Sequence, residues 1–306
     1  MCDRRRRPNR LESSTRSHLN PRKTPFTSQE ELLSSLGTAQ TNEVVARFQD
    51  FAAVPQQKLE DLAHHALAED WGHDLYVLRK YLAVHVRWSI EQSSFTMSDN
   101  QFYVSAGFLQ ARYGTPIYLA FERNAYGTPP WYLRAATPNM AAAELPVPAD
   151  IPEPPPIPSG AEIVMARDHI LGEKGDRVRF LTNTPLVAQI CAVAGAIQWS
   201  INRGLQLPHW YFGRMNYVVP VYLQSREDIT QMPDLVAPVQ VNPNSLLVRT
   251  VLLPHMPYAN CRVGVERQDR LPPWLLDTWS QHSGVEEAEA ESNMAVAGSS
   301  AAAQIG

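Results

Sequence analysis

The sequence predicts an α+β fold, in which N-terminal helices pack with a mixed, mainly antiparallel sheet formed by both halves of the chain. Two patterns predict this class. Residues 56–92 carry apolar side chains at helical spacing, and residues 211–262 hold three β-branched apolar runs separated by Pro, Asn and Asp. At 306 residues and 44% hydrophobic content, the chain can bury a substantial core.

Helices are expected at the start of the folded region. Thr27 or Ser28 followed by Glu30 and Glu31 is typical of a helix start, because acidic side chains are stabilised in the first turn. We predict successive helices that end at Leu36, end at Phe51, span Gln56–Ala68 and span Asp74–Gln92.

Short strands are expected after these helices. Turn residues at Ser105-Ala106 and Tyr113-Gly114 divide the next apolar segment into pieces of strand length. The predicted strands are Phe102–Val104, Gly107–Gln110, Thr115–Phe121 and Trp131–Arg134.

Residues 137–160 contain eight prolines, a density that excludes a helix or a central strand. An extended, polyproline-like connection is therefore predicted. We interpret it as an insertion outside the core of one domain, because neither half of the chain forms a complete sheet without the strands of the other.

The second half begins with a strand at Glu162–Met165 and a buried helix that starts at Thr182 or Thr184 and ends near Asn202. An antiparallel meander is expected next, followed by a short helix within His255–Arg262. The meander strands are Tyr217–Leu223, Leu235–Val241 and Leu246–Leu253.

Both ends of the chain lack apolar residues to bury. Residues 1–25 carry eight basic side chains against two acids, and four glutamates follow Val285. We therefore predict disordered tails at residues 1–26 and 281–306, on either side of a single domain at residues 27–280. Arg4–Arg7 is either a solvated tail or a basic signal for nuclear import or nucleic-acid binding.

The cysteine pattern and the hydropathy predict a soluble protein of the cytoplasm or nucleus. Cys2, Cys191 and Cys261 are far apart and form no CxxC pair, as expected for reduced thiols. No apolar run follows the N-terminal arginines, and the longest apolar stretch is too short to cross a bilayer. No membrane partner is expected, and the oligomeric state stays open.

Two groups of polar residues are candidates for a binding site. Glu122, Arg123 and Asn124 follow a predicted strand, where sites and solvated loops both occur. Arg249, Tyr258, Asn260 and Arg262 gather guanidinium, amide and phenol groups near one sheet end. Such a set can hold a phosphate or an unstacked base. The alternative is that Tyr258 and Arg262 tie their helix to the sheet.

Enzymatic chemistry has weaker support. Glu122 or Asp168 could act as an acid or base in a phosphate-processing reaction, but Asp168 beside His169 is more typical of a helix cap. His64, His65 and His73 lie beside a turn, and neighbouring positions on a helix diverge too far to share a metal ion. We expect no metal site and no cofactor.

A series of motifs between Leu62 and Leu275 resembles the bacterial and fungal family filed as domain of unknown function 3825. The motifs are Glu69-Asp70-Trp71, Phe121-Glu122-Arg123-Asn124, Asp168-His169-Ile170, Val218-Val219-Pro220-Val221-Tyr222-Leu223 and His255–Arg262. Members are often joined to cold-shock or LOTUS-type modules, which implies a link to RNA. Ser105-Ala106 and His255 depart from the family pattern, so a site at those positions would be altered here.

The function predicted from the sequence is a binding module for RNA or a nucleotide or phosphate group. A phosphate-processing enzyme using Glu122 or Asp168, and a protein-interaction scaffold without a small ligand, are the alternatives. Convergence of Glu122, Arg123, Tyr258 and Arg262 in one pocket would favour the binding module.

Overall fold

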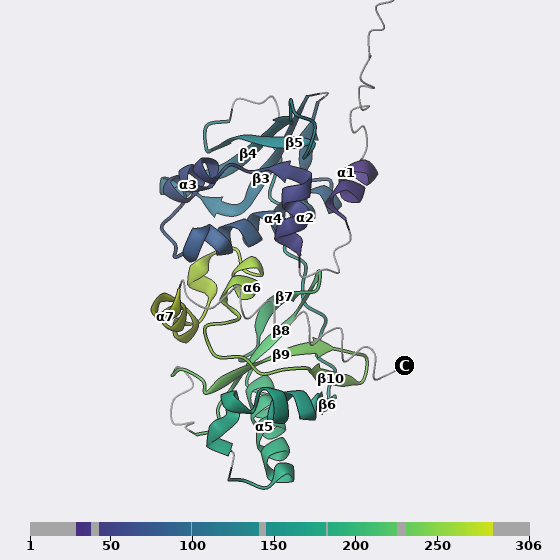
Figure 1. Cartoon of the computed structure of the whole chain (residues 1–306), viewed down its shortest axis with the longest axis vertical. Coiled ribbons are helices and arrows are strands. Elements are labelled where there is room, and N and C mark those ends of the chain that lie inside the picture. Colours follow the sequence, from purple (N-terminus) through teal and green to yellow (C-terminus); the bar gives the residue numbers. More distant parts are fainter. Residues whose placement is uncertain are drawn as a thin grey trace, which may run out of the picture.

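The computed structural model describes residues 29–37, 43–98, 100–140, 145–181, 183–224 and 231–283 (Figure 1). Helices accompany two five-stranded sheets, one from each half of the chain. The α+β class is thereby confirmed, with mixed, mainly antiparallel pairing. The predicted helix start at Thr27 or Ser28 lies outside the described residues, as do both predicted tails apart from residues 281–283.

The first sheet has the order β1-β5-β4-β3-β2. Its strands are β1 (Ala52–Ala53), β2 (Phe95–Met97), β3 (Gln101–Gln110), β4 (Pro116–Arg123) and β5 (Trp131–Thr137). The short β1 is parallel to β5, and the remaining pairs are antiparallel. The predicted break at Ser105-Ala106 is wrong, because β3 continues through it with an irregular register after Ser105.

Helices cover one face of this sheet. They are α1 (Gln29–Leu36), α2 (Val44–Phe51), α3 (Gln56–His65) and α4 (Tyr76–Glu91), close to the predicted spans. Alternate strand residues such as Phe102, Leu119 and Leu133 face these helices and are buried. The residues between them face the other side, as expected for a sheet with one face against a core.

The second sheet has the order β6-β10-β9-β8-β7. Its strands are β6 (Glu162–Met165), β7 (Leu207–Tyr211), β8 (Arg214–Val221), β9 (Leu235–Val241) and β10 (Ser245–Val248). Strands β7 to β10 form an antiparallel meander, and β6 adds parallel to β10. The predicted meander is confirmed, and β7 is an additional strand that the sequence reading missed.

The two faces of the second sheet contact different cores. Val219 and Val221 of β8 pack in a cluster with Val193 and Ile197 of α5 (Leu186–Ile201). Val218, which precedes Val219 and therefore faces the other side of the sheet, packs in the cluster that also holds the first sheet and its helices. The sheet is therefore a middle layer between α5 and the N-terminal half.

The chain end returns to the N-terminal half. Helices α6 (Tyr258–Val263) and α7 (Pro273–His282) lie between the N-terminal helices and the second sheet (Figure 1). Trp274, Leu275 and Trp279 of α7 are buried in the N-terminal cluster. The described residues also form short helical turns, which are η1 (His73–Leu75), η2 (Arg112–Gly114), η3 (Asp168–Glu173), η4 (Gly175–Leu181) and η5 (Gln268–Arg270).

Of the predicted proline-rich segment 137–160, the described residues 138–140 and 145–160 form neither helix nor strand, as predicted, whereas Thr137 is the last residue of β5. Within this segment Ala149 is 1% exposed and packs in the N-terminal cluster, so this residue contributes to the core. The Gln92 side chain binds both backbone groups of Asp150, the residue after Ala149. Its Nε2 donates to Asp150 O at 2.7 Å, and its Oε1 accepts from Asp150 N at 2.8 Å. The segment is thus anchored through Asp150 to the C-terminal end of α4.

The expected single sheet is replaced by two. Both halves contribute strands, but no pairing joins β1–β5 to β6–β10 in the described part of the chain. Contacts through α6, α7 and the shared core hold the halves together instead. Across the same described ranges, no helix combines the length and apolar character needed to cross a bilayer.

Candidate functional site

The residues selected from the sequence lie in three separate places. Glu122, Arg123 and Asn124 end β4, Arg249 follows β10, and Tyr258, Asn260 and Arg262 belong to α6. The three places belong respectively to the first sheet, the second sheet and the junction between the halves.

The residues at the end of β4 point in different directions. Glu122 Oε2 accepts a hydrogen bond from Arg134 Nη1 at 2.8 Å. The Arg123 guanidinium lies over the Trp131 ring, 4.3 Å from its centroid. Asn124 shapes the following turn, since its Nδ2 donates to Pro129 O at 2.8 Å and its Oδ1 accepts from Tyr126 N at 3.1 Å.

Arg249 is exposed, whereas the α6 residues are buried. The exposed fractions are 0% for Tyr258, 6% for Asn260 and 1% for Arg262. Buried guanidinium groups need charge partners, because desolvation disfavours an isolated charge. The partner of Arg262 comes from the other half of the chain.

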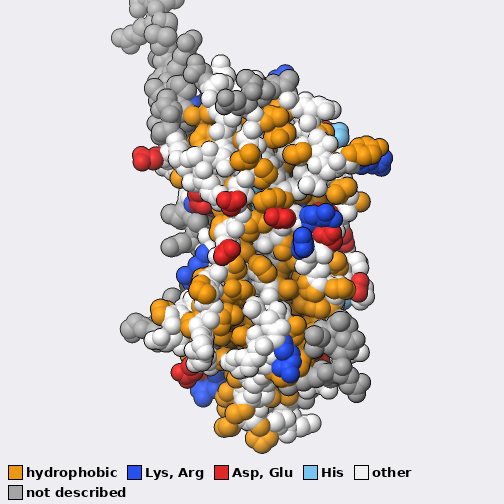
Figure 2. Space-filling model, turned by 180° about the vertical axis from the view of Figure 1, so that it is seen from behind, with side chains coloured by type: hydrophobic (Ala, Val, Ile, Leu, Met, Phe, Trp, Pro, Cys, Tyr) orange, Lys and Arg blue, Asp and Glu red, His pale blue; other side chains and the backbone are white. Residues whose placement is uncertain are grey.

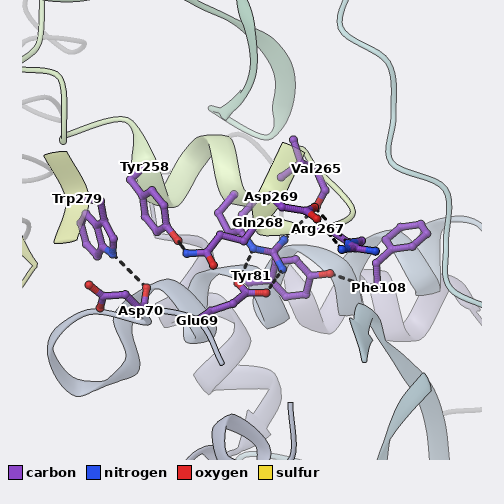
Figure 3. A network of polar contacts seen from close by, with 12 residues as sticks. Glu69, Asp70, Tyr81, Phe108, Tyr258, Val265, Arg267, Gln268, Asp269 and Trp279 are labelled. Carbon is purple, nitrogen blue, oxygen red and sulfur yellow. Dashed lines mark hydrogen bonds and ion pairs between the residues drawn. The ribbon is translucent and has the colours of Figure 1, made fainter. Parts of the chain in front are cut away.

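Glu69 binds Arg262 through both carboxylate oxygens (Figure 3). Arg262 Nε donates to Oε2 at 2.7 Å and Nη2 donates to Oε1 at 2.9 Å, while Nη1 donates to Val265 O at 3.0 Å. The Glu69 side chain is 10% exposed. This geometry supports the alternative reading of Arg262, in which it ties its helix to the rest of the fold.

Aromatic groups of α4 complete the surroundings of Arg262. Its guanidinium lies 4.7 Å from the centroid of the Tyr81 ring, and Tyr81 stacks on His85 at 4.0 Å. Burial raises the pKa of Tyr81 to about 12, although the Arg262 charge opposes the shift. Burial, together with that charge, lowers the pKa of His85 to about 3. Tyr81 and His85 are therefore neutral at pH 7.

Tyr258 belongs to the same junction. Its ring stacks on Trp279 at 4.5 Å and 6°, and its hydroxyl oxygen accepts from Gln268 Nε2 at 2.8 Å. Trp279 Nε1 donates to Asp70 O at 3.0 Å (Figure 3). Glu69-Asp70-Trp71, one of the motifs quoted for the family resemblance, thus supplies contacts to α6 and α7 through Glu69 and Asp70.

Asp168 shows no enclosed site around it. Its side chain is 90% exposed and forms an ion pair with Arg167 at 3.0 Å. Within the described residues, no three His, Cys, Asp or Glu side chains are grouped so that they could hold a metal ion.

A more open surface occurs on the first sheet, on the face turned away from its helices. Tyr103, Tyr118 and Tyr132 lie on β3, β4 and β5, at alternate positions to the buried residues, and each is partly exposed. We call this surface the tyrosine face. The same side of the sheet carries Gln101, Glu122, Arg134, Ala135 and Thr137, together with the buried Ser105 and Ala120.

The strand register places Tyr103 diagonal to Tyr118, with Tyr132 further along the sheet at the other end of β4. Tyr103 pairs with Ala120, and Tyr132 pairs with Glu122, so the tyrosines are level with positions 120, 118 and 122 of β4. Diagonal neighbours on one sheet face are about 7–8 Å apart, and this spacing applies to Tyr103 and Tyr118. The small side chains of Ala120 and Ala135 lie level with Tyr103, between the other two rings.

The helical layer of the first sheet faces the viewer in Figure 1, and Figure 2 shows the molecule from the opposite side. Apolar side chains, a class that includes tyrosine, are scattered there among uncharged groups over the N-terminal half, with few charged side chains. Such a surface can stack planar groups. The tyrosines were missed in the sequence reading, although each occupies the outward position of a predicted strand or of its continuation.

No family model, curated protein or solved structure matches this chain.

Proposed function

We propose that the protein is a binding module for single-stranded RNA or a nucleotide, and that the tyrosine face contacts the bases. The observation that carries the proposal is the presence of three partly exposed tyrosines on one face of three adjacent strands. Membership of the domain of unknown function 3825 family is part of the same proposal, and it rests on the quoted motifs alone.

Stacking supplies the affinity in this proposal. Each base stacked on an aromatic side chain contributes about 1–3 kcal/mol, and an open sheet that carries aromatics can hold two or three unpaired bases. Bases in a duplex are already stacked on one another, so their faces are not free to stack on the tyrosines. The proposal therefore predicts that single strands bind more tightly than a duplex of the same length.

Charge has a secondary part. The whole chain has a formal charge of −4, and Arg134, whose side chain is 66% exposed, is the cation that the tyrosine face presents. Few phosphates can then be neutralised, so the logarithm of affinity should fall only shallowly with the logarithm of salt concentration. A binder that depends on many phosphate contacts would show a steep slope.

The experiment compares tyrosines inside and outside the face. Fluorescence anisotropy with a labelled single-stranded RNA of about ten nucleotides should show each of Tyr103→Leu, Tyr118→Leu and Tyr132→Leu weakening binding about five- to hundredfold. Tyr113 and Tyr126, which are 101% and 95% exposed, lie in turns and supply matched controls. Tyr113→Leu and Tyr126→Leu should bind as the wild type does.

Two results would overturn the proposal. Wild-type protein that binds neither RNA at micromolar nor nucleotide at millimolar concentration would favour the scaffold alternative. Equal losses in the face variants and the control variants would show that the tyrosine face is not the contact surface. The phosphate-processing alternative has less support, because Asp168 lies exposed beside Arg167.

A further inference from the structure

Glu122 occupies a specific position within the tyrosine face. In the strand register it lies between Gln101 of β3 and Tyr132 of β5, and its side chain is 34% exposed. Directly paired residues on one face have Cβ atoms about 4.5–5.5 Å apart. A base stacked on Tyr132 would therefore present its edge to the Glu122 carboxylate.

Arg134 holds the carboxylate in place. Its Nη1 donates to Glu122 Oε2 at 2.8 Å, and it comes from the irregular part of β5, where Ala120 pairs with Ala135 and Phe121 pairs with Leu133. This irregularity leaves Arg134 between the two pairs, on the outer side beside Glu122. A carboxylate has about four acceptor positions, so one bond from Arg134 leaves capacity for a ligand.

The chemistry of this pair discriminates among bases. An ionised carboxylate only accepts hydrogen bonds. Guanine presents two adjacent donors, N1–H and the N2 amino group, on its Watson–Crick edge. Adenine and cytosine place a ring acceptor beside their amino group, and uracil places carbonyls on both sides of N3–H. Guanine alone thus offers two donors to one carboxylate without bringing an acceptor against it.

Arg134 adds a second contact of the right kind. Guanine O6 is an acceptor next to N1–H, and the Arg134 guanidinium has further N–H groups beside Glu122. Along the guanine edge, O6 would thus accept from Arg134, and the neighbouring N1–H and N2 amino group would donate to Glu122. Charged groups strengthen each of these hydrogen bonds.

We propose that Glu122, oriented by Arg134, makes the tyrosine face selective for an unpaired guanine. This inference rests on the proposed function, because it assigns the base that the same face reads. It names a specificity-determining residue and a ligand class, guanine in single-stranded RNA or as a free guanine nucleotide.

The test measures base preference rather than affinity alone. Labelled hexamers that differ at one central position, with G, A, C or U in a run of U, are titrated with wild-type protein. A carboxylate bond to a base donor corresponds to about tenfold or more in affinity, so the G hexamer should bind at least about tenfold more tightly than the others. Replacing that guanine by inosine, which lacks the N2 amino group, should remove much of the preference.

The Glu122→Gln variant tests the residue itself. The amide presents a donor as well as an acceptor, so the G hexamer should lose its advantage to within about twofold, while binding of the U hexamer changes little. Glu162→Gln makes the same chemical change at an exposed position on β6 of the other sheet and should retain the preference.

The outcomes separate the two proposals. A wild type that binds all four hexamers equally, and loses binding in the tyrosine variants, would overturn guanine selectivity and leave the RNA-binding function standing. A preference for G that survives in Glu122→Gln or with inosine would also overturn the inference. A wild type that binds none of the hexamers would overturn both proposals.

Discussion

Arg262 and Glu69 are 193 residues apart in the chain and are joined by two hydrogen bonds of 2.7 and 2.9 Å between nearly buried side chains. This pair connects α6 to the loop before α4. Hydrogen bonds to Glu69 raise the pKa of Arg262 even though burial works in the opposite direction. Arg262 therefore stays charged, and its bonds to Glu69 help to hold the two halves of the chain together.

Arg262→Ala should destabilise the fold by about 3–5 kcal/mol, because the Glu69 carboxylate would be left buried without its partner. Urea unfolding at pH 7 measures the change. Arg267→Ala is the matched control, since Arg267 pairs with Asp269 while both side chains are more than half exposed. It should cost less than about 1 kcal/mol. A similar small cost for Arg262→Ala would contradict the structural role.

The buried histidines predict acid sensitivity. Burial and the nearby Lys80 charge lower the pKa of His209 to about 3, and neither of its ring nitrogens has a hydrogen-bond partner among the described residues. In the unfolded chain the His209 side chain binds a proton near pH 6.5, whereas in the folded chain it does not. Each such histidine therefore removes about 1.4 kcal/mol of stability per pH unit as pH falls from 6.5 towards 3.

His209→Leu should flatten this dependence without loss of stability at pH 7, because it replaces an unpaired buried polar ring by an apolar group. The free energy of unfolding between pH 7 and 5 is the measurement. His64, an exposed residue of α3, provides the control His64→Gln, which should follow the wild-type curve. A wild-type slope in His209→Leu would show that His209 is not protonated on unfolding in this range.

Gly107 and Gly195 should respond in opposite directions to alanine. Gly107 has φ +62°, and an added Cβ would lie 2.6 Å from the Tyr81 hydroxyl oxygen, whereas a Cβ at Gly195 meets no atom within 4 Å. Gly107→Ala should destabilise by at least about 2 kcal/mol through strain and overpacking. Gly195→Ala, within α5, should stabilise by about 0.5–1 kcal/mol. Thermal melts that moved both variants in one direction would refute this contrast.

The two described cysteines should differ in reactivity. Cys191 is exposed on α5, whereas Cys261 is 0% exposed and burial raises the pKa of its thiol. In a Cys2→Ser background, a thiol-specific chromogenic reagent should label one site quickly and the second only in denaturant. Cys191→Ser should abolish the fast phase. Fast labelling that survived in Cys191→Ser would place Cys261 in a more open environment than the structure does.

Part of the fold followed directly from local patterns. The predicted strands Glu162–Met165 and Leu235–Val241 agree with β6 and β9, and the predicted helix ending near Asn202 agrees with α5. Their apolar periodicity and flanking turn residues act within a few positions of the chain. The continuous β3 was missed because Ser105-Ala106 reads as a turn, whereas Gly107 with its positive φ allows the strand to continue against Tyr81 and His85.

The candidate site was less accessible to sequence reasoning. Glu122 was selected from its position at a strand end, and it lies on the tyrosine face, but Tyr103 and Tyr132 were not selected with it. Tyr258 and Arg262 carry groups suited to a ligand, yet their burial beside Glu69 and Gln268 appears only when α6 is packed on the N-terminal half. Chemical type alone did not separate a binding residue from a structural one.

The sequence by itself determined where helices and strands form and which face of each is apolar, because these depend on periods of about 3.6 and 2 residues. Only the tertiary structure decided which strands pair, that the strands divide into two sheets, and that Glu69 meets Arg262. Periodicity shows that a face is buried without showing what covers it. The partner is selected by competition among all segments of the folded chain, and that competition involves residues far apart in sequence.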